Sequence, residues 1–443
     1  MGAAAVPAPT IVRRDPVPAA PRPARPAGTR ALWAMFLGYP LWWCLGLGAM
    51  SWFLLAVPLA WALFRAERIR VPRGFGVWLL FLAWVLLSAT RLAGAGEAIG
   101  FTWRLITYLS ATVVFLFAYN ASPSALPGRR VATALGAVWV AVAMGGWLGV
   151  LAPSGSLPSL TEAFLPGSIA SDPFVHELVS PSFAQVQDFL GYDLGRPKAP
   201  FAYTNDWGSN FGLLFPVFVL GWWGSRNLAR RRLAPVLLLA SLVPALYSLN
   251  RGMWLSLGVG LVYVAIGFAS RGRAAGVRLL VTVAVVLGGA LLVVAPLRSV
   301  VEDRLDTPHS NEGRELLYGQ ALDLVGRSPL IGHGAPQEVG GGKLLPDVGT
   351  QGQLWLVLVS QGAVGTAFFL LALGGAAWRT RRGPTVSFWC HVVLVVALVQ
   401  LPFYDMMPVS LHVIALCAAI ALRRVDEPGH DRPAGADVVP VPA

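Results

Sequence analysis

Uninterrupted apolar segments alternate with shorter polar segments along almost the whole chain. A helix needs ~20 mostly apolar residues to cross a bilayer core of ~30 Å. Segments of this kind predict twelve membrane-spanning helices, at about 31–47, 48–64, 74–90, 105–120, 131–152, 207–224, 234–249, 252–270, 279–297, 352–378, 385–404 and 406–422. The first two form one apolar run from Ala31 to Phe64, which is too long for one helix and which Gly38 and Gly46 can break.

We therefore expect an all-α polytopic membrane protein with two long outer loops. Its expected parts are a disordered tail at 1–30, five spans at 31–152, a first long outer loop at 153–206, four spans at 207–297, a second long outer loop at 298–351, three spans at 352–422 and a disordered tail at 423–443. The first tail has no apolar core or cleavage pattern, so we expect no signal peptide. Loops carry function on a rigid scaffold, so the two long loops are the first place to look for a site.

Composition and charge support this topology. Apolar residues make up 56% of the 443 positions and charged residues only 13%, with a mean hydropathy of +0.62. Arginine clusters occupy every second gap between spans, which is the positive-inside pattern of multi-pass proteins in the bacterial cytoplasmic membrane. Both termini are then cytoplasmic. The net charge of +12 follows from this topology, so we expect a lipid bilayer and no nucleic acid as partner.

The second long loop is predicted to contain an amphipathic helix over about 312–325. Leu317, Ala321 and Val325 share its apolar face at helical spacing. Arg314 belongs to the same side, and its neighbours at three and four residues include no acidic side chain. A guanidinium turned toward a packed surface needs an anion. That anion is either a carboxylate elsewhere in the protein or a substrate, and the sequence leaves both open.

Arg251 presents the same choice at the outer junction of two apolar spans. Its helical neighbours include no carboxylate, and arginine at membrane depth is by default a candidate site residue. The alternatives are contact with lipid headgroups or stacking on Trp254. Arginine binds phosphate oxygens in a bidentate fork, so one lipid-linked phosphate shared by Arg251 and Arg314 explains both residues together.

Other common chemistries have no pattern in this chain. The sequence has no metal-spaced His and Cys set, no phosphate-binding glycine loop and no Ser-His-Asp order. Cys44, Cys390 and Cys417 all fall within expected spans, so no disulfide framework is expected in the loops. We expect no metal and no cofactor.

Three segments, in order, resemble the O-antigen ligase and O-antigen polymerase superfamily. Arg196-Pro-Lys-Ala-Pro-Phe-Ala-Tyr-Thr-Asn205, continuing to Asn210, resembles its Arg-x-x-Gly-x-Phe segment. Leu249-Asn-Arg-Gly resembles its Ser-Arg-Gly signature. Arg314 with Pro329-Leu-Ile-Gly-His-Gly334, followed by Gly362-x-x-Gly365, resembles its long-loop block. The likeness covers about residues 190–370 and implies a type C glycosyltransferase-like membrane fold.

The resemblance also implies site residues, with one departure. Members of this family usually carry a catalytic histidine about eleven residues before the glycine matched by Gly362, and this chain has Gln351 there. Glutamine cannot act as a general base. His333, His309 and Asp347 are the nearby candidates to replace that histidine.

The implied activity is transfer of an undecaprenyl-diphosphate-linked glycan to a glycan, lipid or protein acceptor at the outer face of the membrane. Arg251 and Arg314 would bind the diphosphate, and Arg196 and Asn205 would contribute to substrate binding. The first alternative is a polymerase, whose acceptor is a second lipid-linked glycan. An alternative from another class is a non-enzymatic transporter or flippase. Transporters usually have ionisable residues within spans and internal repeats, and the expected spans here have no Asp, Glu, Lys or Arg.

Overall fold

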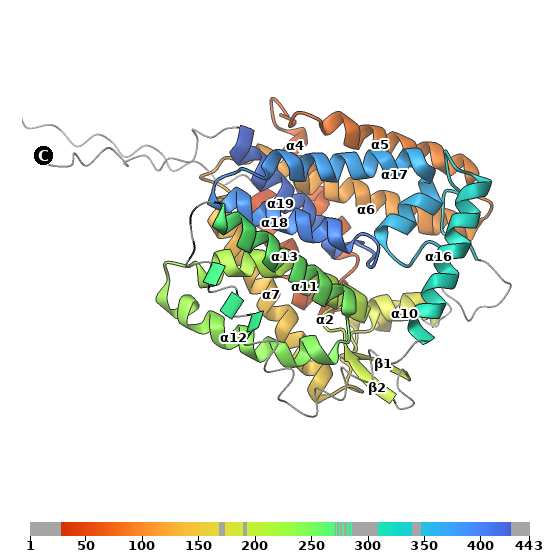
Figure 1. The fold of residues 1–443 in the computed structure, drawn as a ribbon. Coiled ribbons are helices and arrows are strands. Elements are labelled where there is room, and N and C mark those ends of the chain that lie inside the picture. The colour runs from red at the N-terminus through yellow and green to blue at the C-terminus, as the bar shows by residue number, and fades with distance from the viewer. Residues whose placement is uncertain are drawn as a thin grey trace, which may run out of the picture.

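The computed structural model describes residues 28–167, 173–188, 193–270, isolated positions between 272 and 285, 309–338 and 347–426. For residues 173–174, 187–188, 193–194 and 309–314 it describes the backbone alone. Figure 1 shows the fold, a bundle of helices with one small β-hairpin at its edge.

The helices in chain order are α1 (Gly28–Leu37), α2 (Tyr39–Cys44), α3 (Ser51–Leu54), α4 (Ala56–Phe64), α5 (Phe75–Ser88), the 3-10 turn η1 (Ala89–Arg91), α6 (Ala95–Asn120), α7 (Gly128–Leu151), α8 (Leu160–Phe164), α10 (Pro173–Val179), α11 (Thr204–Phe218), the π-helical turn η2 (Val219–Trp223), α12 (Leu228–Tyr247), α13 (Arg251–Ala269), α16 (His309–Arg327), α17 (Gln353–Thr380), α18 (Thr385–Gln400) and α19 (Val409–Asp426). The mostly helical fold class is confirmed.

Four of the described helices, α6, α7, α13 and α17, are long and apolar enough to cross a membrane. The expected span at 31–47 contains α1 and α2, which are separated at Gly38, and the expected span at 48–64 contains α3 and α4, which are separated at Leu55. The chain breaks between the two spans after Cys44, close to Gly46. Most of the expected span at 279–297 lies outside the described residues. The full count of twelve spans stays a prediction.

Helices α11, α18 and α19 lie at the centre of the bundle, and their residues are mostly buried. α6 packs on α19, α7 on α11, and α5 on α17. The largest buried side chains include Trp52, Trp139 and Trp207. A buried indole N–H without an acceptor costs free energy, and Trp139 and Trp207 donate to the carbonyls of Phe211 and Val142 over 3.1 and 2.9 Å.

The gaps expected on the outer side contact one another. Thr161 Oγ1 donates to the carbonyl of Leu45 over 2.7 Å, which joins the first gap to the first long loop. Gln337 Nε2 donates to Glu97 over 3.2 Å, which joins the second long loop to the gap before α6. These contacts gather the expected outer gaps at one end of the bundle, where Figure 1 shows α10, α16 and the hairpin.

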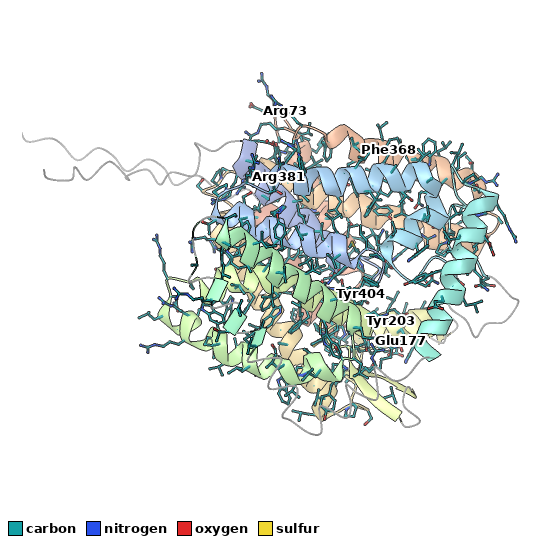
Figure 2. All side chains as sticks on the ribbon, viewed as in Figure 1. Arg73, Glu177, Tyr203, Phe368, Arg381 and Tyr404 are labelled. Atoms are coloured by element: carbon teal, nitrogen blue, oxygen red, sulfur yellow. The ribbon has the colours of Figure 1, made fainter. Side chains whose placement is uncertain are left out.

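The gaps expected on the cytoplasmic side likewise contact one another. The backbone N–H of Arg70 donates to Asn120 Oδ1 over 2.7 Å, and Arg379 pairs with Asp426 at 2.5 Å. Figure 2 shows Arg73 and Arg381 toward the end of the bundle opposite α16. These contacts agree with the alternation of outer and cytoplasmic gaps that the charges predict. Which end of the bundle faces the cell exterior stays a prediction.

The first long loop contains a β-hairpin that the helical expectation did not include. Strands β1 (Ala184–Asp188) and β2 (Asp193–Pro197) pair antiparallel, with Val186 opposite Gly195. Five-residue strands satisfy each other's backbone polar groups where no helix forms. The hairpin delivers Arg196 to the surface of the helical bundle, because β2 packs on α7 and α12.

Helix α16 lies across the end of the bundle, as Figure 1 shows. Its buried side chains are Leu317, Ala321 and Leu324, which form a small apolar cluster with Val348 and Val359. Leu317 and Ala321 are buried as the spacing predicts, and Leu324 is more deeply buried than the expected Val325. The ring of Tyr318 also stacks on Trp355 of α17 with centroids 4.5 Å apart.

Helix α17 is broken at Gly362, where φ is +68° and ψ is −172°. The turn after α16 fills the break. His333 and Gly334 donate their N–H groups to the carbonyls of Val359 and Ser360 over 2.9 and 2.8 Å. A side chain on Gly332 (φ +75°) would lie 2.6 Å from the Gly362 nitrogen, so this backbone contact requires glycine. The two glycine motifs of the sequence therefore form one structural unit.

Candidate functional site

Arg196 is buried at the end of β2, with 7% of its surface exposed. Its Nε donates to the carbonyl of Ser248 over 2.8 Å, and its Nη2 donates to Asn250 Oδ1 over 3.1 Å. Asn250 immediately precedes Arg251. The structure therefore brings together two of the three motifs on which the resemblance rests, although they come from different parts of the chain.

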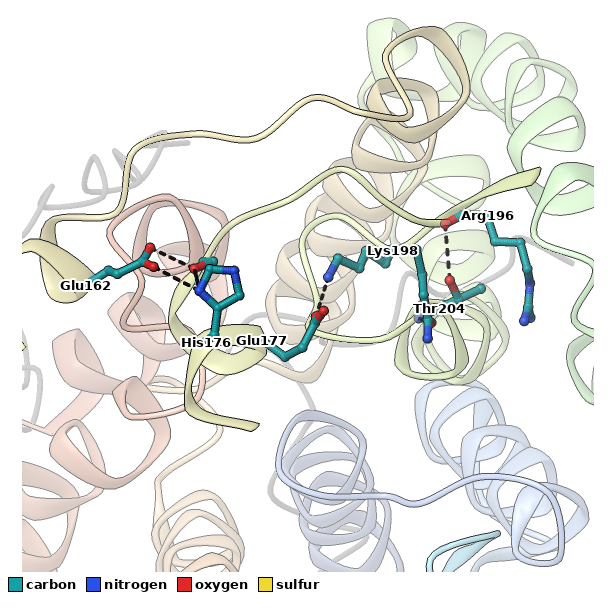
Figure 3. Close-up of polar contacts among 8 residues, drawn as sticks. Glu162, His176, Glu177, Arg196, Lys198 and Thr204 are labelled. Atoms are coloured by element: carbon teal, nitrogen blue, oxygen red, sulfur yellow. Dashed lines mark hydrogen bonds and ion pairs between the residues drawn. The ribbon is translucent and has the colours of Figure 1, made fainter. Parts of the chain in front are cut away.

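Asn250 connects this junction to α11 as well. Its Nδ2 donates to the carbonyl of Thr204 over 2.9 Å, and Thr204 Oγ1 donates to the carbonyl of Arg196. Figure 3 shows Thr204 beneath Arg196. Asn205 follows Thr204 in the first turn of α11 and is exposed. Asn250 therefore bonds to Arg196 and to the residue before Asn205, and it directly precedes Arg251.

Arg251 is the first residue of α13 and is half-buried. The chain enters this helix through Leu249, which has a φ of +53° and is 1% exposed. This conformation is costly for a leucine, and such strain clusters at functional sites. The first N–H groups of a helix face anions favourably. The position suits a cationic side chain that receives an anionic ligand.

Arg314 and His309 both lie in the N-terminal part of α16. Their side chains are outside the described part, so the convergence of Arg314 with Arg251 stays a prediction.

His333 and Gln351 occupy defined positions in the second long loop. His333 Nε2 is 2.9 Å from the carbonyl of Leu324, near the C-terminal end of α16. Gln351 Oε1 accepts from the N–H of Gly349 over 2.9 Å, and its Nε2 donates to the carbonyl of Asp347 over 3.1 Å. These bonds organise the loop that enters α17. Asp347 is an exposed residue of this loop. Its carboxyl group is still partly shielded from solvent, and this partial burial raises its pKa.

Two carboxyl groups that the sequence reading did not single out lie at the same end. Asp206 is in the first turn of α11, just before the expected span at 207–224, and accepts from the N–H of Tyr203. Asp405 lies in the loop between α18 and α19, where it accepts from the N–H of Met407 over 3.1 Å. Burial, together with the smaller effect of the charge of Asp405, raises the pKa of Asp206 to about 8. Burial also raises the pKa of Asp405 to about 6. The charge of Asp405 therefore acts on Asp206 across this end of the bundle.

Arg104 is the positively charged residue that acts on the Asp405 carboxyl group. It lies on α6, which begins ten residues before the expected span at 105–120, so this helix contains Glu97 and Arg104 within its length. Burial raises the pKa of Asp405 and of Asp347, and the positive charge of Arg104 opposes this rise in both. The signal for Asp405 was available in the sequence, because it is the single Asp, Glu, Lys or Arg between Arg382 and Arg423.

Ion pairs fix the first long loop around the site. Lys198 is buried and its Nζ lies 2.5 Å from Glu177 of α10, while His176 Nδ1 lies 2.9 Å from Glu162. Figure 3 shows these pairs side by side along the loop. Figure 2 places Glu177, Tyr203 and Tyr404 at this end of the bundle. Within the described residues, no group of three His, Cys, Asp or Glu side chains has the geometry to hold a metal ion.

Comparison with known proteins identifies the central part of the chain. Residues 236–363 match the family model described as O-antigen ligase. No curated protein matches the chain. The matched stretch contains Arg251, helix α16 and the Gly332–Gly362 contact, so the resemblance read from these motifs is confirmed. The match over residues 236–363 thus supports a relation of this chain to the O-antigen ligase and polymerase superfamily and points to a membrane enzyme of cell-surface polysaccharide synthesis.

Proposed function

We propose that this protein transfers a glycan from a polyprenyl diphosphate, undecaprenyl diphosphate in bacteria, to an acceptor at the outer face of the cytoplasmic membrane. The observation that carries the proposal is the family match over residues 236–363, together with the packing of Arg196 against the residue that precedes Arg251. Both arginine motifs belong to the end of the bundle at which the expected outer gaps meet.

In this proposal the chemistry depends on charge. The diphosphate of the donor binds at the N-terminus of α13, where Arg251 contacts it and the positive end of the helix dipole favours an anion. Arg314 joins it from α16. As the bond between the sugar and the diphosphate breaks, negative charge builds up on the leaving phosphate, and preorganised cations stabilise that charge. Arg196 and Asn250 act as positioning residues, because they hold the turn from which Arg251 projects.

Direct attack by the acceptor hydroxyl would invert the configuration at the sugar carbon. A ligase and a polymerase share this donor chemistry and differ in the acceptor. The acceptor of a ligase is another envelope molecule, and the acceptor of a polymerase is a second lipid-linked glycan.

The test is a deletion strain complemented with the wild-type gene or with Arg251→Ala. Loss of the protein should remove one surface glycan while full-length lipid-linked glycan accumulates, if the enzyme is a ligase. Accumulation of single repeat units would identify a polymerase instead. Unchanged surface glycans and unchanged lipid-linked intermediates in the deletion strain would refute the proposal.

A further inference from the structure

Arg104 carries hydrogen-bond donors that the folded chain does not use. Its Nε and Nη2 atoms are shielded from solvent and have no hydrogen-bond partner among the residues that the structure describes. A buried N–H group without an acceptor costs free energy comparable to a lost hydrogen bond. The guanidinium group is therefore set to donate to something that binds beside it.

Two of the acidic groups around Arg104, Glu97 and Asp405, accept hydrogen bonds from other groups. Glu97 accepts from the N–H of Ala93 over 2.7 Å and from Gln337 over 3.2 Å. Asp405 accepts from the N–H groups of Met406 and Met407. Both carboxyl groups are close enough to act on the charge of Arg104, yet neither accepts a hydrogen bond from it. Arg104 and these carboxyl groups thus act on one another by charge, and no hydrogen bond joins them.

Gln353 fixes the position of Asp405 relative to Arg104. This residue is fully buried. Its backbone N–H donates to the carbonyl of Tyr404 over 2.8 Å, and its Oε1 accepts from the N–H of Met406 over 3.2 Å. Its Nε2 donates to the hydroxyl of Tyr108 over 3.0 Å, and Tyr108 is one helical turn after Arg104 on α6. One glutamine therefore ties the loop on both sides of Asp405 to the turn that carries Arg104.

The same loop adjoins the proposed diphosphate site. A Cβ atom placed on Gly252, the residue after Arg251, would lie 3.0 Å from the hydroxyl of Tyr404. Asp405 follows Tyr404 directly. The loop that carries Asp405 therefore contacts the first turn of α13, where the proposed diphosphate site lies.

We propose that Arg104 and Asp405 form the acceptor subsite, in which the Arg104 guanidinium donates hydrogen bonds to hydroxyl oxygens of a polyhydroxylated acceptor and the Asp405 carboxylate takes the proton of the attacking hydroxyl. This inference rests on the proposed function. The acceptor oxygen forms a bond to the anomeric carbon, and the bond from that carbon to the phosphate oxygen breaks. The electron pair leaves with the diphosphate, and the proton moves to Asp405 and then to water.

The surroundings of Asp405 suit this task. Gln351 stands where the family has histidine, and an amide cannot accept the proton. The charged groups that act on Asp405 and its neighbours are Arg104 on α6, Asp347 before α17 and Asp206 on α11. Burial raises the pKa of Asp405 to about 6, which leaves it ionised at neutral pH and close to the value at which a general base is most effective.

The experiment uses membranes of the deletion strain carrying each full-length variant. Lipid-linked glycan extracted from that strain is the donor, and its glycan-free envelope fraction is the acceptor. The transfer rate is measured while the donor concentration is varied at constant acceptor, and while the acceptor concentration is varied at constant donor. Arg104→Gln should raise the acceptor concentration for half-maximal rate at least about tenfold and leave the donor value unchanged. Arg104→Lys should be intermediate, and Arg91→Gln, an exposed arginine near the same helix, is the matched control.

Asp405→Asn should lower the maximal rate at least about a hundredfold, as expected when a general base is lost. Asp405→Glu should recover part of the rate with a displaced pH profile, and Asp323→Asn on the exposed face of α16 is the matched control. Wild-type rate should fall as pH drops below about 6. Amount and folding of each variant are checked by size-exclusion chromatography in detergent.

Two results would overturn the inference. The first is wild-type kinetics in both Arg104→Gln and Asp405→Asn while Arg251→Ala is inactive, which would leave the proposed function intact. The second is a change in donor dependence alone for Arg104→Gln. Failure of the wild-type protein to transfer any glycan would refute the proposed function itself.

Discussion

Arg196 Nη2 donates to Asn250 Oδ1 over 3.1 Å, so a residue of the first long loop holds the residue next to Arg251. The pair is buried and joins the hairpin to the junction of α12 and α13. Arg196, which the family resemblance predicts to be a substrate-binding residue, thus also shapes the turn before Arg251.

Arg196→Ala should lower the free energy of unfolding by ~1.5–3 kcal/mol, because it removes charge-assisted hydrogen bonds and leaves buried acceptors unsatisfied. Arg226→Ala, an exposed arginine between η2 and α12, should change stability little. Thermal unfolding followed by tryptophan fluorescence in detergent measures both. Equal melting temperatures for the two variants would contradict the structural role of Arg196.

Arg251→Ala should reduce glycan transfer at least about tenfold, because a lost charged contact to a bound anion costs ~1.5–3 kcal/mol. Arg251→Lys should recover part of the activity, since lysine keeps the charge and loses the bidentate fork. The measurement is surface-glycan attachment at matched protein levels, determined by immunoblot. Full activity of the alanine variant would make Arg251 a structural residue or a lipid anchor.

His333→Gln should retain transfer activity within about threefold, because glutamine can still donate to the carbonyl of Leu324 and hold the end of α16. A loss of two orders of magnitude in a well-folded His333→Gln protein would assign the missing catalytic base to His333.

The stability of the protein should fall as pH rises from about 3.9 to about 8, the pKa of Asp206 in the folded state, and should level off above that. The unfolded chain has the ordinary value of about 3.9, so between these values the folded state holds a proton that the unfolded state has lost. The stabilising contribution is complete at low pH and disappears as Asp206 ionises. Asp206→Asn should therefore gain melting temperature over wild type at pH 9 and gain less at pH 7. Parallel pH profiles for the two proteins would refute the raised pKa. Asp405, with a pKa of about 6, adds the same dependence only up to about pH 6, so the difference between pH 7 and pH 9 reports on Asp206.

The expected topology can be tested with two serine positions that are both exposed. In a background without Cys44, Cys390 and Cys417, Ser156→Cys in the first long loop should react with an impermeant maleimide in intact spheroplasts. Ser124→Cys, between α6 and α7, should react only after lysis. The opposite result would reverse the orientation and remove the outer-face site.

Hydropathy predicted the class of fold because each span must bury its own backbone polar groups. The apolar pattern could not predict the break in α17, since Gly362 sits in a continuous apolar run. The glycines at 332 and 362 were visible as motifs, but their contact depends on a turn 30 residues away. The hairpin was missed because Val186 and Gly195 give no strong alternation in so short a segment.

The candidate site was predictable where a motif named it and hidden where one residue acted alone. Arg196 and Arg251 were found because each sits in a recognisable segment. Arg104 and Asp405 are single charges at the edges of apolar runs, and only the packing that Gln353 imposes brings them to one place. Asp206 looks like an ordinary helix-start residue until its burial and its charged neighbour are known.

Because α17 is broken at Gly362, the two ends of α16 are held differently. The C-terminal end of α16 is clamped, because the turn after it supplies N–H groups to carbonyls that the broken helix leaves open, and Trp84 of α5 donates to the carbonyls of Gln361 and Leu330 over 3.0 and 3.3 Å. Releasing that end would expose several unpaired carbonyl groups inside the bundle. If α16 moves while these bonds hold, it must rotate about residues 328–334. The N-terminal part of the helix, which contains Arg314, would then move farthest.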